Sequence, residues 1–230
     1  EKELLANVSH EIRSPLARIN VALELCAEEG STETDIKKHL EGIADDVTDL
    51  ERLVDDVLTA ARLDLTADSN EESKLVPRTE RIDLFEIASK SAKRFASSHP
   101  ERKLVFTDSQ KLLSIEADPL LVRRVLDNLL GNATKYSPPE ADIEIGMFRE
   151  AECEVLEVRD RGIGIPENDR TRIFEPFFRT DRSRTPGTGG VGLGLTLSKR
   201  IITAHGGTIA ALPRDGGGTI FRVSFPSNIK

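Results

Sequence analysis

The feature that most constrains this chain is a heptad pattern of apolar residues in its first third. The pattern advances in alternating steps of four and three residues, which is typical of helices that pack along a shared seam. The earlier run comprises Ile12, Leu16, Ile19, Leu23 and Cys26, and the later run comprises Ile36, Leu40, Ile43, Val47, Leu50, Val54, Val57 and Ala61. Gly30 lies between the two runs and suits a turn. Residues 1–66 are therefore predicted to form a helical hairpin.

Two helices alone leave part of such a long seam uncovered. Pairing two hairpins into a four-helix bundle would bury the remaining apolar surface, so we expect a homodimer. Residues 67–80 are largely polar and have no apolar periodicity, as in a linker. The domain boundary is placed in this linker, and a second domain is expected over residues 81–230.

In the second domain, helical patterns alternate with short runs rich in β-branched residues. Helices are expected over 84–97, 118–135 and 191–205, and strands near 104–108, 142–148, 153–159, 207–212 and 219–225. The last two strands flank three consecutive glycines, which indicates a hairpin. The simplest architecture is a mixed sheet with helices on one face, an α/β sandwich. The expected fold is therefore α+β, with a helical hairpin that forms a dimeric four-helix bundle followed by the α/β sandwich.

Charge and composition exclude several classes of function. The chain carries a net charge of −8, which argues against nonspecific binding to nucleic acid. Residues 1–66 hold 7 Lys and Arg against 16 Asp and Glu, or −9, which leaves +1 for the rest of the chain. No stretch approaches the roughly 18 apolar residues of a membrane helix, so no membrane contact is expected of this fragment. Cys26 and Cys153 lack the spacing of a metal site or a disulfide framework.

The first candidate catalytic residue is His10, on the first predicted helix. At about 100° per residue, His10 lies about 160° around the helix from the seam residue Ile12 and should face solvent. Glu11 can take or orient one ring proton, which suits a histidine nucleophile. Pro15 bends the helix about one turn later, and packing alone rarely retains so costly a feature. Ordinary surface positions are expected for the other three histidines, His39, His99 and His205.

A second group of polar residues follows on the helix predicted over 118–135. Asn128 and Asn132 are four residues apart and share a helix face, so both amide oxygens could bind Mg²⁺. Lys135 lies nearby and could contact a phosphate. A simple polar helix face is the alternative, and the spacing alone leaves it open.

Two glycine-rich segments suggest a nucleotide site. Glycines before a helix, as in 187–195, let backbone N–H groups converge on phosphate oxygens. Asp160 follows a predicted strand and opens the other segment, where its carboxylate could accept hydrogen bonds from an adenine amino group. Residues 173–190 lie between the two and suggest a hinged lid. Phe174 and Phe177 of this segment are expected to pack in the core.

In this order, the segments resemble the sensor histidine kinases of two-component signalling, which join a histidine-containing dimerisation hairpin to a Bergerat-type ATP-binding domain. The resemblance covers essentially the whole chain. It assigns 9–16 to the H box, 128–136 to the N box, 160–164 to the G1 box, 174–178 to the F box, 190–195 to the G2 box and 218–221 to the closing glycine motif. The sequences SHEIRSPL and PFFRTDRSR are most similar to envelope-stress sensors of the Cpx type.

The resemblance implies a homodimeric kinase that uses ATP and Mg²⁺ to phosphorylate His10, with Glu11 as acid/base partner. The phosphoryl group would pass to an aspartate on the receiver domain of a response regulator. Ser14 would orient water for the reverse, phosphatase reaction, although it could instead bond a carbonyl one turn back. Asn128 and Asn132 would hold Mg²⁺. The implied nucleotide contacts are Asn128, Asn132, Lys135, Tyr136, Asp160, Gly162, Gly164, Arg179, Arg182, Gly190, Gly192, Leu193, Gly194 and Thr219.

Two positions depart from the family pattern, and two other functions compete with a histidine kinase. Ser14 stands where Thr or Asn is common, and Val191 stands where Thr often precedes the Gly-Leu-Gly sequence. An ATPase clamp of the same nucleotide fold would lack an outward His-Glu pair on a heptad hairpin, and a scaffold without catalysis would not need His10, Asn132 and Asp160 intact. Since the hairpin segment begins only a few residues before His10, and a complete hairpin would normally start further upstream, we expect the cytoplasmic core of a longer bacterial sensor anchored in the inner membrane.

Overall fold

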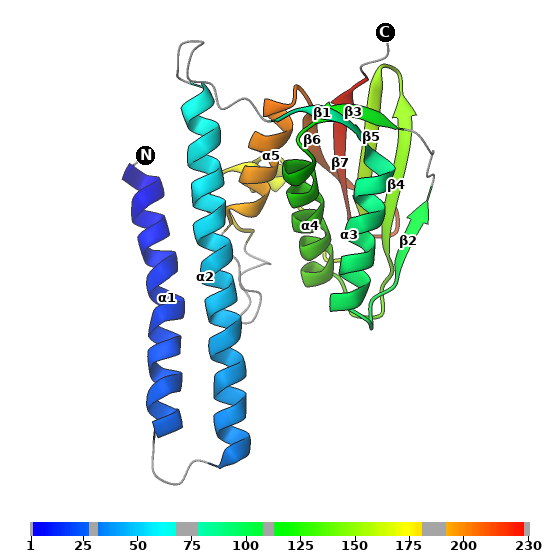
Figure 1. Cartoon of the computed structure of the whole chain (residues 1–230). Coiled ribbons are helices and arrows are strands. Elements are labelled where there is room, and N and C mark those ends of the chain that lie inside the picture. Colours follow the sequence, from blue (N-terminus) through cyan, green and yellow to red (C-terminus); the bar gives the residue numbers. More distant parts are fainter. Residues whose placement is uncertain (1, 28–31, 68–77, 108–112, 181–191, 228–230) are drawn as a thin grey trace.

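The computed structural model describes residues 2–27, 32–67, 78–107, 113–180 and 192–227. It has two parts, a long helical hairpin and an α/β domain (Figure 1). The hairpin consists of α1 (Lys2–Ala27) and α2 (Glu33–Ala67), with Pro15 inside α1. Thr32 directly precedes α2 and caps it, because its Oγ1 accepts a hydrogen bond of 3.2 Å from the Asp35 amide. The predicted helical hairpin is therefore confirmed.

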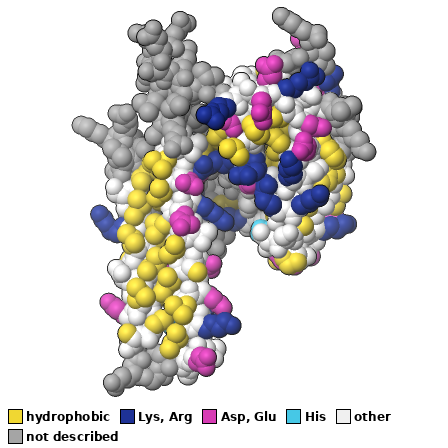
Figure 2. Space-filling model, viewed as in Figure 1, with side chains coloured by type: hydrophobic (Ala, Val, Ile, Leu, Met, Phe, Trp, Pro, Cys, Tyr) yellow, Lys and Arg dark blue, Asp and Glu magenta, His cyan; other side chains and the backbone are white. Residues whose placement is uncertain are grey.

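The heptad residues of the hairpin divide into two sets with different exposure. The set that is half-buried comprises Ile12, Ile19, Cys26, Ile36, Ile43, Leu50 and Val57. The exposed set comprises Leu16, Leu23, Leu40, Val47 and Val54, with exposed fractions from 42% to 53%. Members of each set on one helix are seven residues apart, so each set lies on one helix face. Figure 2 shows the hydrophobic side chains as a band along the hairpin.

The α/β domain is built on a five-stranded mixed sheet. The strand order is β2-β4-β5-β7-β6, in which only the β2–β4 pair is parallel. The strands are β2 (Leu104–Thr107), β4 (Ile143–Glu150), β5 (Cys153–Arg159), β6 (Thr208–Pro213) and β7 (Thr219–Pro226). A separate antiparallel pair consists of β1 (Glu80–Asp83) and β3 (Ser114–Ala117). Two short 3-10 turns, η1 (Glu167–Asp169) and η2 (Arg172–Phe174), follow β5.

Three helices, α3 (Leu84–Ser98), α4 (Pro119–Tyr136) and α5 (Gly194–Ala204), cover one face of the sheet (Figure 1). Alternate residues of β4, namely Ile143, Ile145 and Met147, are fully buried against them. The period of two on the strand and the apolar stripe on each helix explain this packing. The α/β sandwich is thus confirmed. The predicted helices and strands agree within three residues, whereas the four-residue strands β1 and β3 were not predicted.

Both ends of α4 are held by residues distant in sequence. At its start, the Asp118 carboxylate accepts hydrogen bonds of 2.9 and 3.2 Å from the amides of Leu120 and Leu121. The Asp118 amide in turn donates to Nε2 of His205 at 3.0 Å, while Nδ1 of that ring bonds the Ile201 carbonyl at 2.7 Å. The His205 ring therefore ties the end of α5 to the start of α4. The expectation of an ordinary surface position for His205 is wrong.

At the other end of α4, the buried guanidinium of Arg102 binds a carbonyl of the last helical turn and carbonyls of the loop that follows it. Arg102 donates to the carbonyl oxygens of Thr134 (2.6 Å), Ser137 (2.7 Å) and Ala141 (3.3 Å), and also to that of Pro138. A cation at this end also opposes the negative end of the helix dipole. Arg102 therefore fixes the last turn of α4 and the loop that follows it.

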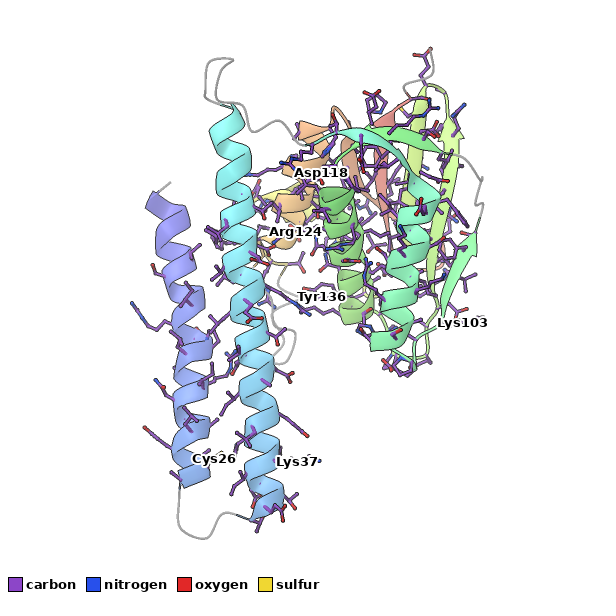
Figure 3. All side chains as sticks on the ribbon, in the orientation of Figure 1. Cys26, Lys37, Lys103, Asp118, Arg124 and Tyr136 are labelled. Carbon is purple, nitrogen blue, oxygen red and sulfur yellow. The ribbon has the colours of Figure 1, made fainter. Side chains whose placement is uncertain are left out.

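The α/β domain is docked on α2. Arg124 of α4 donates to Oδ1 of Asp56 at 2.8 Å and to Oγ1 of Thr59 at 2.7 Å, and it projects toward α2 in Figure 3. Ala60 of α2 packs against the core of the α/β domain. Burial raises the pKa of the Asp56 carboxyl, although Arg124 opposes the shift. Apolar packing and an ion pair therefore join the two domains.

Candidate nucleotide-binding site

Most of the predicted nucleotide residues come from four segments, which are the second half of α4, the loop after β5, the residues at and just before the start of α5, and the start of β7. Asn128 and Asn132 are one turn apart on α4, and both are partly exposed. The Lys135 ammonium lies 5.1 Å from the centre of the Tyr136 ring, in the last turn of the same helix. These side chains therefore line the end of α4 that meets the loop after β5.

Asp160 is the buried acid of the site. It directly follows β5, as predicted, and is only 3% exposed. Its Oδ1 accepts hydrogen bonds from the amides of Gly162 at 2.7 Å and Thr219 at 3.3 Å. Burial raises the pKa of the Asp160 carboxyl, whereas these two amides and the charge of Arg214 act in the opposite direction. Asp160 is thus a fixed, buried acceptor of hydrogen bonds.

The loop after β5 is joined to the end of α4 at Gly162. A side-chain carbon on Gly162 would overlap the Tyr136 carbonyl oxygen, so the close approach of the two backbones requires glycine here. The next amide, that of Ile163, donates to the same carbonyl at 3.2 Å. Because Arg102 holds the adjoining turn, Tyr136 and Asp160 keep a fixed relation to each other.

Asn128 connects α4 to the first turns of α5. Its Nδ2 donates a hydrogen bond of 2.9 Å to Oγ of Ser198, a serine that is 2% exposed. Its Oδ1 faces Gly194, where a side-chain carbon would overlap that oxygen. Leu193 is buried and precedes α5 directly. The glycine at 194 thus serves the contact between the two helices, a role that the phosphate-loop pattern did not suggest.

Two phenylalanines lie in and just after η2, and one of them contacts the residues before α5. Phe174 is 7% exposed and lies in the core, as expected, while Phe177 is half-buried. Phe177 has a φ of 61° and donates its amide to the Gly192 carbonyl at 3.1 Å. A positive φ is strained for a bulky residue, so surrounding contacts must hold this conformation.

The remaining predicted residues are placed as follows. Arg179 and Gly164 are half-buried, and Thr219 is 5% exposed at the start of β7. Ser14 is exposed on α1. His10 and Glu11 belong to α1, but their side chains lie outside the described part of the structure. Arg182, Gly190 and Val191, together with most of the predicted lid, also lie outside it.

The donor set fits Mg²⁺ better than a transition metal. In the described part of the chain, no group of three or more His, Cys, Asp or Glu side chains could hold a metal. Mg²⁺ needs few protein ligands, because it keeps waters and binds the phosphates of its nucleotide. The amide oxygens of Asn128 and Asn132 have the right chemistry for such a site.

Sequence reasoning missed the residues that support the site from a distance. Arg102, Ser198, Arg214 and His205 act through partners at least 32 positions away in the chain. A local pattern holds no signal for such pairs. The nucleotide residues themselves were found because they lie in short, contiguous motifs.

Two family models match this chain. Residues 1–66 match the His Kinase A (phospho-acceptor) domain, and residues 117–229 match the histidine kinase-, DNA gyrase B- and HSP90-like ATPase. The sensor histidine kinase WalK of Bacillus subtilis is 35% identical over 98% of this chain and 36% of its own length. The sensor protein KdpD of Clostridium acetobutylicum is 32% identical over 98% of this chain and 25% of its own length. The chain thus spans about a quarter to a third of these curated relatives.

Solved structures show the same arrangement of domains. The histidine kinase AdeS of Acinetobacter baumannii is 26% identical with a TM-score of 0.71, over 96% of this chain and 98% of that one. The histidine kinase ThkA, solved in complex with the response regulator protein TrrA, is 25% identical with a TM-score of 0.78, over 98% of this chain and 61% of that one. With a phospho-acceptor hairpin followed by an ATPase domain, this chain belongs to the sensor histidine kinases.

The raised pKa of Asp160 predicts how the Asp160→Asn variant responds to pH. Between the ordinary pKa of about 3.8 and the raised pKa, folded Asp160 keeps a proton that the unfolded chain has released. The free energy of unfolding of the wild type therefore falls as pH rises through this window. Asn cannot ionise, but its oxygen still accepts from both amides. The free energy of unfolding of the variant, relative to that of the wild type, should therefore rise with pH through this window. Above the raised pKa the difference should stay constant.

Urea unfolding of both proteins between pH 4 and pH 8 measures this difference. A stability difference that is flat, or that shrinks as pH rises, would contradict the environment described for Asp160. The nucleotide should be left out, so that only the unliganded fold is compared.

Proposed function

We propose that this chain binds ATP, phosphorylates its own His10 and passes the phosphoryl group to an aspartate of a response regulator. The observation that best supports the proposal is that one chain contains both a phospho-acceptor domain and an ATPase domain. The phospho-acceptor match contains His10, and the ATPase match contains Asp160 with Asn128 and Asn132. The solved complex of ThkA with TrrA supports a response regulator as the partner.

In the proposed complex, each part of ATP has a recognising group. Asp160 accepts a hydrogen bond from the adenine amino group, and Tyr136 packs on the base. Lys135 and the backbone amides of the turn at Gly192 contact the phosphates, with Arg179 and Arg182 as further candidates. Thr219 and the glycines at 162, 164, 190 and 194 line the site. Asn128 and Asn132 would hold Mg²⁺, which offsets charge on the phosphates.

The proposed reaction is an in-line transfer to the histidine ring. A ring nitrogen of His10 attacks the terminal phosphorus, the bond to the bridging oxygen breaks, and ADP leaves. Glu11 accepts the proton that the ring gives up. The protein contributes mainly position and charge, because phosphoryl transfer needs little other chemistry from it.

The α/β domain must approach His10 for this transfer. In the structure it is docked on α2 through Arg124 and Asp56. Residues 67–80, most of which lie outside the described part of the structure, are proposed as the connection between the two domains, since α2 ends at Ala67 and β1 begins at Glu80. Release of the Arg124 contact is then part of the reaction cycle.

We further propose that the chain is the cytoplasmic part of a sensor anchored in the inner membrane. The curated relatives are sensor proteins roughly three to four times as long as the matched region. Within the residues that the structure describes, every helix is too short or too polar to cross a bilayer. The likeness to Cpx-type envelope-stress sensors stays a prediction.

His10→Gln tests the phosphoacceptor. Labelling from radioactive ATP should be lost, while the affinity for ATP should stay nearly unchanged, because the acceptor and the nucleotide site are on different domains. His39→Gln, on α2, is the matched control and should label normally. Acid-labile, base-stable label that persists in His10→Gln would refute the assignment.

A homodimer is proposed on the exposed apolar stripe of the hairpin. Leu16 and Leu23 on α1 and Leu40, Val47 and Val54 on α2 are each at least 42% exposed. Such a contiguous stripe at heptad spacing is typical of a surface that pairs with another hairpin. A second copy of the chain offers the same stripe, so a two-fold pairing would cover both.

Replacing Val47 and Val54 by Lys should dissociate this dimer, because each bundle would bury four charges at a cost of several kcal/mol. Light scattering over a range of concentrations measures the change. The exposed pair Glu51 and Arg52, replaced by Lys, lies on the same helix and is the control. If the variant dimerises as tightly as the wild type, the exposed stripe is not the dimer interface.

A phosphatase activity is proposed for Ser14. The position lies one turn after His10, about 40° away around α1, so the two residues share a face. A hydroxyl can hold an attacking water through one donor and two acceptor sites. Ser14 is exposed on α1, where a docked receiver domain could reach it.

Ser14→Ala should slow dephosphorylation of the receiver by about tenfold, the effect of one lost hydrogen bond. Labelling of His10 should stay near normal. Rates with a phosphorylated receiver and with ATP measure the two activities separately. If both fall together, or if neither changes, Ser14 serves the helix rather than the reaction.

A further inference from the structure

The contact between Asn128 and Ser198 lies next to the proposed metal site. Asn128 is on α4, and Ser198 is on the second turn of α5. The Nδ2 group of Asn128 donates to the serine Oγ at 2.9 Å. Ser198 is 2% exposed and Asn128 is partly exposed, so only the serine end of this hydrogen bond is fully buried.

An asparagine amide has two chemically different ends, and only the oxygen end can bind a metal ion. The hydrogen bond to Ser198 occupies the nitrogen end. The oxygen end then faces Gly194, at the first turn of α5. The first amides of a helix lack partners within the helix, so this region favours phosphate oxygens.

We propose that Ser198 is a positioning residue for the metal site. By accepting the hydrogen bond from Nδ2, it holds the amide of Asn128 with Oδ1 turned toward the start of α5. The inference rests on the proposed role of Asn128 as a ligand of Mg²⁺. Groups that orient a metal ligand typically change metal affinity by about 10- to 100-fold when they are removed.

A purely structural role would be filled as well by an apolar pair. A buried polar group is costly unless it is bonded, and replacing both partners by apolar groups of the same shape is nearly neutral. Leu129 of α4 and Leu197 and Ile201 of α5 already belong to one buried apolar cluster. The Asn128–Ser198 bond is therefore better explained by the orientation that it gives the amide.

A double-mutant cycle with Ser198→Ala and Asn128→Ala tests the proposal. The readout is binding of a fluorescent ATP analogue during Mg²⁺ titration, and again in EDTA. Ser198→Ala should need about tenfold more Mg²⁺ for half-saturation, with nearly the same affinity in EDTA. Combined with Asn128→Ala, it should add no further loss, because it acts through that side chain.

Two further variants complete the design. Ser91→Ala is the matched control, since Ser91 is also buried on a helix that covers the sheet but accepts its bond from Arg94. It should leave the Mg²⁺ requirement unchanged. Ser198→Cys keeps a side chain of similar size with a weaker acceptor, so it should shift the requirement in the same direction as Ala. Urea unfolding of every variant confirms that the fold is intact.

The outcomes separate this inference from the proposed function. If Asn128→Ala leaves the Mg²⁺ requirement unchanged, Asn128 is not a ligand and that part of the proposed function fails. If Asn128→Ala raises the requirement but Ser198→Ala and Ser198→Cys do not, the positioning role is overturned. It is also overturned if Ser198→Ala weakens binding equally with and without Mg²⁺, because that loss reports packing alone.

Discussion

Burial of one face of α4 against the sheet is the constraint on which the rest of the structure depends. The apolar side chains Val125, Leu126 and Leu129 are at most 1% exposed, and together they fix the rotation of the helix about its axis. Once that rotation is fixed, every other face of α4 has a set direction. Arg124 points to α2 and Asn128 to α5, while the last turn meets the loop that carries the buried acid. The packing of this one face of α4 therefore orients the docking contact, the proposed metal ligand and the proposed adenine pocket together.

Much of the fold could be predicted because its signals are local and periodic. The heptad pattern predicted the hairpin, and the short runs of β-branched residues predicted all five strands of the main sheet. The two strands of the small sheet, such as Glu80–Asp83, were missed because four residues of mixed polarity carry too little periodicity. Residues 191–205 were expected to be one helix, but α5 begins at Gly194. Glycines near the start of a helix make its first residue hard to predict, because glycine adopts both turn and helical conformations.

The site was predictable only in its contiguous motifs. Asp160 and the asparagines stand in sequence patterns whose chemistry can be read without a structure. Their supporting contacts come from elsewhere, since Arg102 reaches the end of α4 and Ser198 reaches Asn128 across a helix interface. Such pairs are set by tertiary packing, which no local spacing encodes. His205 shows the same limit, because its two ring nitrogens join two helix ends that are 87 residues apart. Sequence motifs therefore name the groups that touch a ligand, while the fold determines which groups hold them in place.

The uneven charge of the chain has opposite effects on its two proposed associations. The hairpin segment carries −9, so two hairpins in a dimer repel each other, and the apolar stripe must offset that repulsion. Salt weakens the repulsion, because the Debye length is about 8 Å at physiological ionic strength. The same acidity favours docking of the α/β domain, where Arg124 meets Asp56 in a pair that is 30% and 25% exposed. Such partly buried charges are screened less than surface pairs. Rising salt should therefore strengthen the pairing of hairpins while leaving the docked contact comparatively unaffected, so the two associations respond to different physical forces.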